Sequence, residues 1–263
     1  MHKVKQTISR SIPYLGLLSA LICLIISIPI ALKTLKDYRI YQHYSTRQLE
    51  IIAQQSQATP QELQIIDISN QVHDNPLHIA LITGHGTDIH GFYDSGAVAF
   101  DMSYEHTHIQ YIATLIKANL ETLGGAVTLF DENVYRNIKY HGALYDFSPY
   151  DFVIEIHFNA SEHGLYSGTQ IIYNTYNDSD LTVHYAVSNA LQLITGNSIV
   201  YSDDEFITQQ TIAQQGIPSM LLEVVHIDNQ SDYTLYMNHQ DAIAQAISDS
   251  LVTSLKAKEA RSK

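Results

Sequence analysis

The chain has 263 residues and a formal net charge of −13. Between Arg47 and Lys256 it holds only three basic residues against 25 acidic ones. This balance argues against nucleic acid as a partner, because contacts to phosphate groups need Lys and Arg side chains. The single cysteine, Cys23, allows no intramolecular disulfide, so cysteine usage does not identify an oxidising compartment.

Residues 12–32 form an almost uninterrupted apolar stretch of 21 residues, and about 20 residues suffice to span a bilayer. Lys3, Lys5 and Arg10 precede the stretch, as expected for a cytoplasmic N-terminus at residues 1–11. No clear cleavage pattern of small residues follows it. We therefore predict a single-pass transmembrane helix that anchors an extracytoplasmic domain to the cell membrane. The alternative is a signal peptide, after whose cleavage the protein is secreted.

A stalk or linker is predicted over residues 33–72, which are rich in Gln and interrupted by Pro60. From residue 73 short apolar runs alternate with amphipathic segments, so residues 73–263 are interpreted as one globular domain. The apolar runs predict buried strands over residues 77–82, 126–130, 151–157, 168–173 and 219–225. The amphipathic segments predict helices over residues 104–123, 179–194 and 241–256. This alternation indicates an α/β fold, a three-layer sandwich in which helices flank a mostly parallel central sheet.

Four ionisable side chains occupy notable positions in this pattern. They are His85 after the first strand, Glu105 at the start of the first long helix, His157 at the end of the third strand, and Glu223 inside the last strand. Open α/β sheets place their ligand sites beyond the carboxyl ends of the strands, so we expect these side chains to converge. Two imidazoles and one carboxylate leave Zn²⁺ an open position for water or substrate. A further carboxylate can then move the protons.

Each of these residues also has a structural interpretation. His85 alone fits a polar loop residue, and Glu105 alone fits a carboxylate favoured by the helix dipole. Glu223 is the strongest single signal, because a carboxylate within an apolar strand is costly to bury without a metal, a partner or a raised pKa. Glu155 alternates onto the same strand face as His157. It either partners that imidazole or faces solvent, and solvent is the preferred interpretation.

The order of the motifs resembles the zinc-dependent N-acetylmuramoyl-L-alanine amidases of cell-wall turnover and division. The resemblance covers about residues 77–255. It rests on Gly-His-Gly at 84–86, the Glu that opens a helix at 105, Ile-His-Phe-Asn-Ala at 156–160, and Leu-Leu-Glu at 221–223 with a later Asn. It implies that His85, Glu105 and His157 are the zinc ligands and that Glu223 is the catalytic general acid and base.

The resemblance also implies a reaction and a partner. The partner is peptidoglycan, in which the enzyme hydrolyses the amide between N-acetylmuramic acid and L-alanine. Asn159 and Asn229, the asparagines of the two later motifs, are interpreted as substrate-binding residues. The chain departs from the family pattern in an insertion at about residues 87–93 and in Glu155, which replaces a small residue.

Two other functions remain open at this point. One is a zinc peptidase or amidohydrolase that acts on another amide. The insertion at about residues 87–93 is the main reason to consider it. The other is a non-catalytic wall-binding ectodomain of the same fold. The need for an activator protein is also left open.

Overall fold

The computed structural model describes residues 76–176 and 180–262. Within these ranges no helix has both the length and the apolar character needed to cross a membrane. The predicted cytoplasmic N-terminus (1–11), transmembrane helix (12–32) and stalk (33–72) all lie outside the described residues.

A six-stranded sheet forms the centre of the domain, in the order β4-β1-β5-β8-β6-β7. Its strands are β1 (His78–Thr83), β4 (Ala126–Phe130), β5 (Phe152–Asn159), β6 (Thr169–Tyr173), β7 (Ser198–Ser202) and β8 (Ser219–His226). Strands β4, β1, β5 and β8 are parallel, whereas β6 runs antiparallel to β8 and parallel to β7. The predicted α/β class with a mostly parallel sheet is thereby confirmed.

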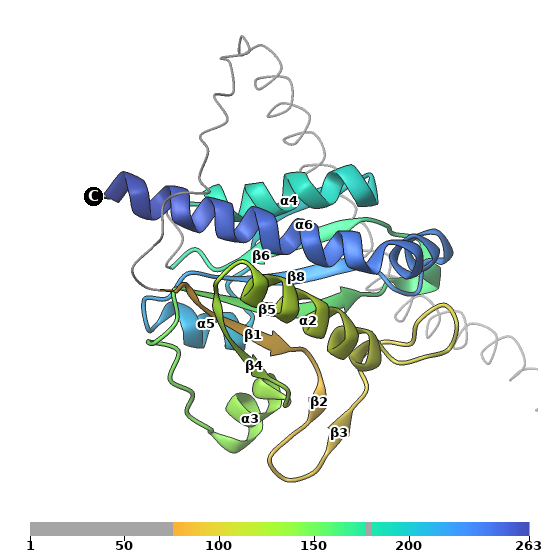
Figure 1. Cartoon of the computed structure of the whole chain (residues 1–263). Coiled ribbons are helices and arrows are strands. Elements are labelled where there is room, and N and C mark those ends of the chain that lie inside the picture. The colour runs from red at the N-terminus through yellow and green to blue at the C-terminus, as the bar shows by residue number, and fades with distance from the viewer. Residues whose placement is uncertain (1–75, 177–179, 263) are drawn as a thin grey trace, which may run out of the picture. The chain divides into compact units, whose positions relative to one another are not determined.

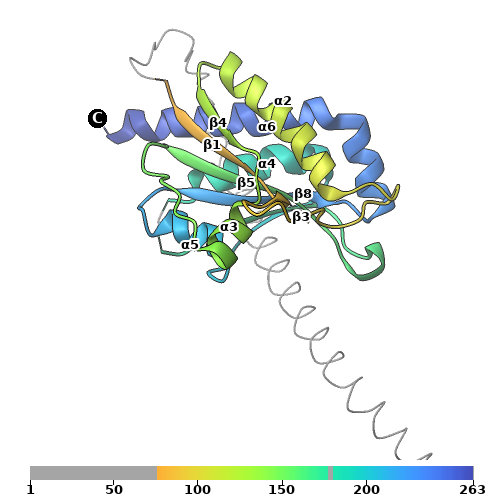
Figure 2. The same cartoon turned by 90° about the horizontal axis from the view of Figure 1, so that it is seen from below.

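Helices cover both faces of this sheet (Figures 1 and 2). On one face lie α2 (Glu105–Thr122), α4 (Thr182–Thr195) and α6 (Gln230–Ser262), and on the other lie α3 (Val134–His141) and α5 (Ile207–Ala213). A short 3-10 helix, η2 (Glu162–Gly164), and a two-stranded ribbon of β2 (Gly86–Thr87) and β3 (Tyr93–Asp94) complete the described elements.

The two faces differ in the size of their apolar cores. The α2, α4 and α6 face buries a cluster of 29 residues, whereas the α3 and α5 face buries a cluster of six. Alternation along β5 sends Ile154, Ile156 and Phe158 into the large cluster. The intervening residues point to the thinner face, where Val153 joins the small cluster. Glu155 and His157, which share this alternation with Val153, therefore lie on the thinner face.

Among the strands of the central sheet and the α-helices, β7, α3 and α5 were not predicted from the sequence. The last helix was predicted over residues 241–256, and this segment lies in the second part of α6, after a break in helical geometry at His239 (φ −132°, ψ 22°). The first part, from Gln230, was not predicted; Asn229 precedes it, and its Oδ1 accepts hydrogen bonds from the backbone N–H groups of Ser231 (2.9 Å) and Asp232 (3.1 Å). This is the hydrogen-bond pattern of an N-cap residue.

The insertion at residues 87–93 forms the turn between β2 and β3 and is tied to α3. Asp88 is buried and accepts hydrogen bonds from Nε2 of His141 (2.9 Å) and Nε of Arg136 (3.2 Å). The Arg136 guanidinium also lies 4.0 Å above the ring centroid of Phe92. The bond from His141, together with those from Arg136 and nearby backbone N–H groups, holds the pKa of Asp88 well below its usual range.

Candidate active site

His85 is aimed into the site by an unusual backbone turn after β1. Its φ angle is 63°, and that of Gly86 is 88°, so two successive residues adopt left-handed conformations. Gly84 precedes them, and its N–H donates to the Ile156 carbonyl at 2.9 Å. A Cβ atom at position 84 would lie 2.3 Å from Cε1 of His157. Only glycine therefore lets the His157 ring pack directly on this backbone.

Glu105 is the first residue of α2 and is almost completely buried. Its Oε2 accepts the Ala97 N–H at 2.7 Å, and its Oε1 accepts the Phe158 N–H at 2.9 Å. Gly96 makes room for it, since a Cβ there would lie 2.5 Å from Oε2 of Glu105. Backbone groups from two separate segments thus fix the orientation of this carboxylate.

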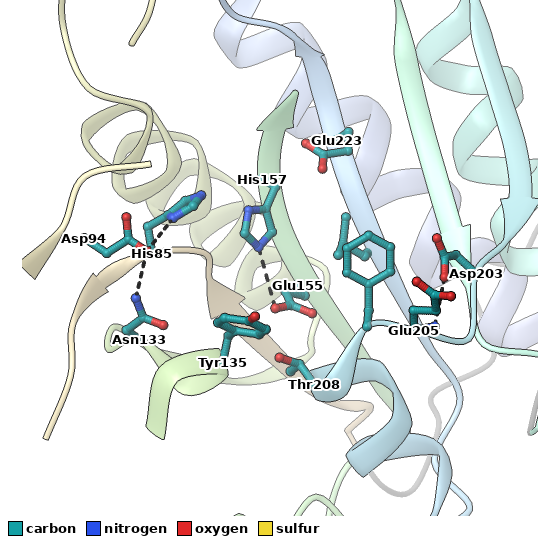
Figure 3. A pocket seen from close by; sticks show the side chains of 12 residues that line it. His85, Asp94, Asn133, Tyr135, Glu155, His157, Asp203, Glu205, Thr208 and Glu223 are labelled. Atoms are coloured by element: carbon teal, nitrogen blue, oxygen red, sulfur yellow. Dashed lines mark hydrogen bonds and ion pairs between the residues drawn. The ribbon is translucent and has the colours of Figure 1, made fainter. Parts of the chain in front are cut away.

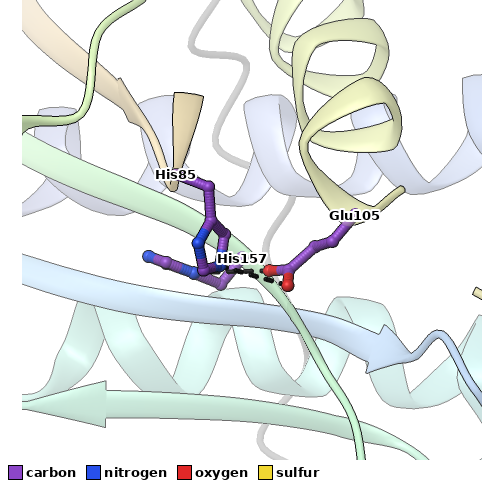
Figure 4. A group of neighbouring side chains, drawn as sticks. All are labelled: His85, Glu105 and His157. Carbon is purple, nitrogen blue, oxygen red and sulfur yellow. Dashed lines mark ion pairs between the residues drawn. The ribbon is translucent and has the colours of Figure 1, made fainter. Parts of the chain in front are cut away.

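The structure brings His85, Glu105 and His157 together (Figure 4). Nε2 of His85 lies 3.1 Å from Oε2 of Glu105, and Nδ1 of His157 lies 3.4 Å from Oε1 of Glu105. One ligand atom from each residue can be chosen so that all three lie within 4.8 Å of one another. Bonds of about 2.0–2.1 Å to a tetrahedral zinc separate neighbouring ligand atoms by about 3.3–3.4 Å. The donor types and their spacing therefore fit zinc, and no other such group occurs among the described residues.

Opposite charges stabilise this cluster. Burial disfavours the charged form of Glu105, but hydrogen bonds and charge interactions with His157 and His85 prevail and hold its pKa well below the usual range. Burial likewise disfavours the His157 imidazolium. Hydrogen bonds to Glu105 and Glu155, with the charge of Glu223, prevail here too and raise the pKa of His157 well above its usual value. The surroundings of both side chains therefore favour a bound positive charge.

Each imidazole also faces a second carboxylate on its other ring nitrogen. Nδ1 of His85 lies 3.2 Å from Oδ2 of Asp94, and Nε2 of His157 lies 3.6 Å from Oε1 of Glu155 (Figure 3). The preferred interpretation of Glu155 as a solvent-facing residue is wrong, because only 3% of it is exposed. Strand β5 is an inner strand, and Gln209 of α5 covers Glu155 by donating to its Oε2.

Glu223 lies beside His157, because the two residues are paired in the register of β5 and β8. Its Oε2 atom is buried and has no hydrogen-bond partner among the described residues. Burial raises the pKa of Glu223 to about 7; the charges of Glu105 and Glu155 add to this effect, and those of His157 and His85 oppose it. A carboxyl group with such a pKa can both accept and donate protons near neutral pH.

A cavity of about 380 Å³ opens in front of these side chains (Figure 3). It is lined by His85, Asp94, Asn133, Tyr135, Glu155, His157, Asp203, Glu205, Phe206, Thr208, Leu221 and Glu223. Sequence reasoning missed the contributions of α3 and of the segment that leads into α5. Helices α3 and α5 have only eight and seven residues, which is too short for a periodic pattern to identify them in the sequence.

The two asparagines interpreted as substrate-binding residues do not line this cavity. Asn159 donates from Nδ2 to Oε1 of Gln170 at 3.0 Å. Asn229 caps α6 and donates from Nδ2 to the Gly164 carbonyl at 2.8 Å. Their side chains are thus engaged in holding strands and loops, and a role in substrate binding stays a prediction.

A family model and several solved structures are similar to this chain. The family model described as N-acetylmuramoyl-L-alanine amidase matches residues 79–253. No curated protein matches the chain by sequence. The CwlD amidase from Clostridioides difficile, solved in complex with the GerS lipoprotein, is 22% identical with a TM-score of 0.57, and the match covers 69% of this chain and 99% of that one.

Two further solved structures share the fold. The N-acetylmuramoyl-L-alanine amidase AmiC2 of Nostoc punctiforme is 18% identical, with a TM-score of 0.54 and coverage of 70% of this chain and 99% of that one. The catalytic domain of the CD27L endolysin, which targets Clostridia difficile, is 19% identical, with a TM-score of 0.55 and coverage of 68% and 98%. The likeness to these structures shows the fold, and the family model, which matches well over half of the chain, shows that this protein belongs to the N-acetylmuramoyl-L-alanine amidase family.

Proposed function

We propose that this peptidoglycan amidase is a zinc enzyme with His85, Glu105 and His157 as ligands and Glu223 as general acid and base. The observation that carries the proposal is the convergence of one carboxylate and two imidazoles at ligand spacing. The bond cleaved is the amide between the lactyl group of N-acetylmuramic acid and L-alanine.

Zinc held by these residues would polarise the scissile carbonyl and lower the pKa of a nearby water. Glu223 accepts a proton from the attacking water as the new C–O bond forms. It then donates a proton to the departing amine of L-alanine as the C–N bond breaks, which returns Glu223 to its starting state. The position of Glu223 beside His157, with a buried Oε2 that has no hydrogen-bond partner among the described residues, supports this role.

Membrane attachment is a separate part of the proposal. The apolar residues 12–32 anchor the protein, and residues 33–72 link the anchor to the catalytic domain. Fractionation of cells that produce the full chain, or a chain starting at residue 33, tests this. The full chain is expected in the membrane fraction and the shorter chain outside it. Equal distribution of the two chains would contradict the anchor.

The decisive test of the enzyme is zinc content measured together with release of stem peptides from peptidoglycan. We expect about one zinc per chain, release of stem peptides with a free L-alanine amine, and loss of activity with a chelator that added zinc restores. Zinc binding with hydrolysis only of simple peptides would favour a peptidase. A folded protein without zinc would favour wall binding without catalysis.

A further inference from the structure

Glu155 is a buried carboxylate beside the proposed metal centre, and both of its oxygens face donors. Oε1 lies 3.6 Å from Nε2 of His157, and Oε2 accepts a hydrogen bond from Nε2 of Gln209 at 2.8 Å. Residues 155 and 157 are two apart on one strand, so their side chains lie on the same face of β5. The contact between Glu155 and His157 therefore follows directly from the strand geometry.

Gln209 holds Glu155 in place from α5. It is completely buried, and its Oε1 accepts a hydrogen bond from Oγ of Ser219 at 2.8 Å. The amide orientation follows from these two partners, because its amino group must face the carboxylate and its carbonyl oxygen must face the hydroxyl. A continuous buried chain of hydrogen bonds thus joins Ser219, at the start of β8, to Glu155.

His157 lies between two carboxylates, Glu105 at Nδ1 and Glu155 at Nε2. A neutral imidazole carries a proton on only one ring nitrogen, and a partner at one nitrogen decides which nitrogen remains free to bind a metal. At His157 the nitrogen that faces the ligand group is Nδ1, whereas at His85 it is Nε2.

We propose that Glu155 is a positioning residue: its Oε1, at ion-pair distance from Nε2 of His157 in this structure, accepts the Nε2–H when zinc is bound and leaves Nδ1 free to bind the metal. Gln209 and Ser219 hold the carboxylate in the required orientation. The inference rests on the proposed function, since it assumes that the centre formed by His85, Glu105 and His157 binds zinc.

A simpler explanation would be that any negative charge in the cavity attracts the cation. Glu205 provides the matched control, because it lines the same cavity, while no ion pair or hydrogen bond joins its carboxylate to His157 among the described residues. Glu155→Gln and Glu205→Gln remove the same charge from the same cavity. Only the first places an amide beside His157, and its one acceptor oxygen must face the amino group of Gln209, which turns its own amino group toward Nε2–H of His157.

The test is zinc affinity of the full chain, measured by competition with a chelator. We expect Glu155→Gln to weaken zinc binding about 10- to 100-fold and Glu205→Gln to change it less than about twofold. Excess zinc should restore much of the amidase activity of Glu155→Gln, because the missing contact acts through metal binding. Unchanged affinity in Glu155→Gln, or equal weakening in both variants, would overturn the inference.

Gln209→Leu is the second variant, because it keeps the Glu155 carboxylate but removes its support. We expect Gln209→Leu to lose less zinc affinity than Glu155→Gln. If thermal denaturation shows that Glu155→Gln does not fold, Gln209→Leu provides the test instead. An affinity equal to that of the unmodified chain would contradict a positioning role for the buried hydrogen-bond chain. If the unmodified chain itself binds no zinc, the proposed function fails first, and that result is distinct from a difference between variants.

Discussion

His184 and His157 lie on opposite faces of the central sheet and have opposite electrostatic surroundings. His184, on α4, packs near the rings of Phe152 and Tyr173 and has an Nε2 atom 2.9 Å from the Ser219 carbonyl. Burial lowers the pKa of His184 to about 4, so it is neutral at physiological pH. At His157 the surrounding carboxylates outweigh burial and raise the pKa.

This difference shows how one sheet serves two purposes. The face covered by α2, α4 and α6 gains stability from apolar burial, and His184 within it is held neutral. The face covered by α3 and α5 has a small apolar core and gathers charged groups at the carboxyl ends of the strands. Neighbouring residues of one strand should therefore respond to mutation in different ways.

The largest effect is expected from His157→Ala, which removes a proposed zinc ligand from the charged face. Both bound zinc and amidase activity should fall below detection, because two remaining ligands hold zinc weakly. Metal analysis and stem-peptide release measure the two losses. Activity retained by this variant would exclude His157 as a ligand.

Glu223→Ala should retain zinc but lose about 10²- to 10⁴-fold in kcat, the usual contribution of general acid and base catalysis. Its stability should not fall, because the removed carboxylate is partly buried and its Oε2 has no hydrogen-bond partner. Kinetics, metal analysis and thermal denaturation on one preparation test all three statements. Loss of zinc from this variant would show that Glu223 is a ligand.

Leu222→Ala changes the residue next to Glu223 on the same strand but affects the apolar face, where Leu222 is fully buried. The free energy of unfolding should fall by about 2–5 kcal/mol. Zinc affinity and kcat should be retained at temperatures where the variant is folded. Denaturant titration measures the stability loss, and a loss of zinc affinity in the folded variant would contradict the separation of the two faces.

The smallest effect is a pH dependence of stability from His184. Its folded-state pKa of about 4 lies below the ordinary value of 6.5, so the unfolded chain binds an extra proton between these values. The contribution to stability is complete above pH 6.5 and is lost as the pH falls toward 4, by about 3 kcal/mol in total.

Denaturant titrations of the unmodified chain and of His184→Gln across this pH range measure that contribution. Gln keeps a donor for the Ser219 carbonyl but does not titrate. The variant should therefore lose less stability on acidification. Parallel pH profiles for the two proteins would show that His184 is not the source.

The long apolar elements and the ligand group could be predicted from the sequence better than the short polar elements. Five strands were predicted close to their observed bounds, because continuous apolar runs such as residues 219–225 report burial on both faces of a sheet. Helices α3 and α5 escaped prediction, since α3 has only Val134 and Asn137 buried. Because α5 was not predicted, nothing in the sequence indicated that Gln209 covers Glu155. Glu155 was therefore predicted to face solvent.

The site follows the same rule. The convergence of His85, Glu105 and His157 was expected, because residues at strand ends and at a helix start meet at one edge of a parallel sheet. The walls of the cavity depend on side chains from segments that do not pair in the sheet, such as Tyr135 and Phe206. Their positions depend on tertiary packing that no local pattern encodes.

The close approach of the His157 ring to Gly84 makes a residue other than glycine at position 84 incompatible with the observed position of that ring. Every other amino acid adds a Cβ atom, and here that atom would overlap the ring that is proposed to bind zinc. The cavity that His157 lines gives the imidazole room to move away from the overlap, at the expense of its position beside Glu105. A library of position-84 variants selected for expression and folding alone would therefore still retain alanine and serine. The same library selected for growth that depends on cell-wall hydrolysis would return glycine.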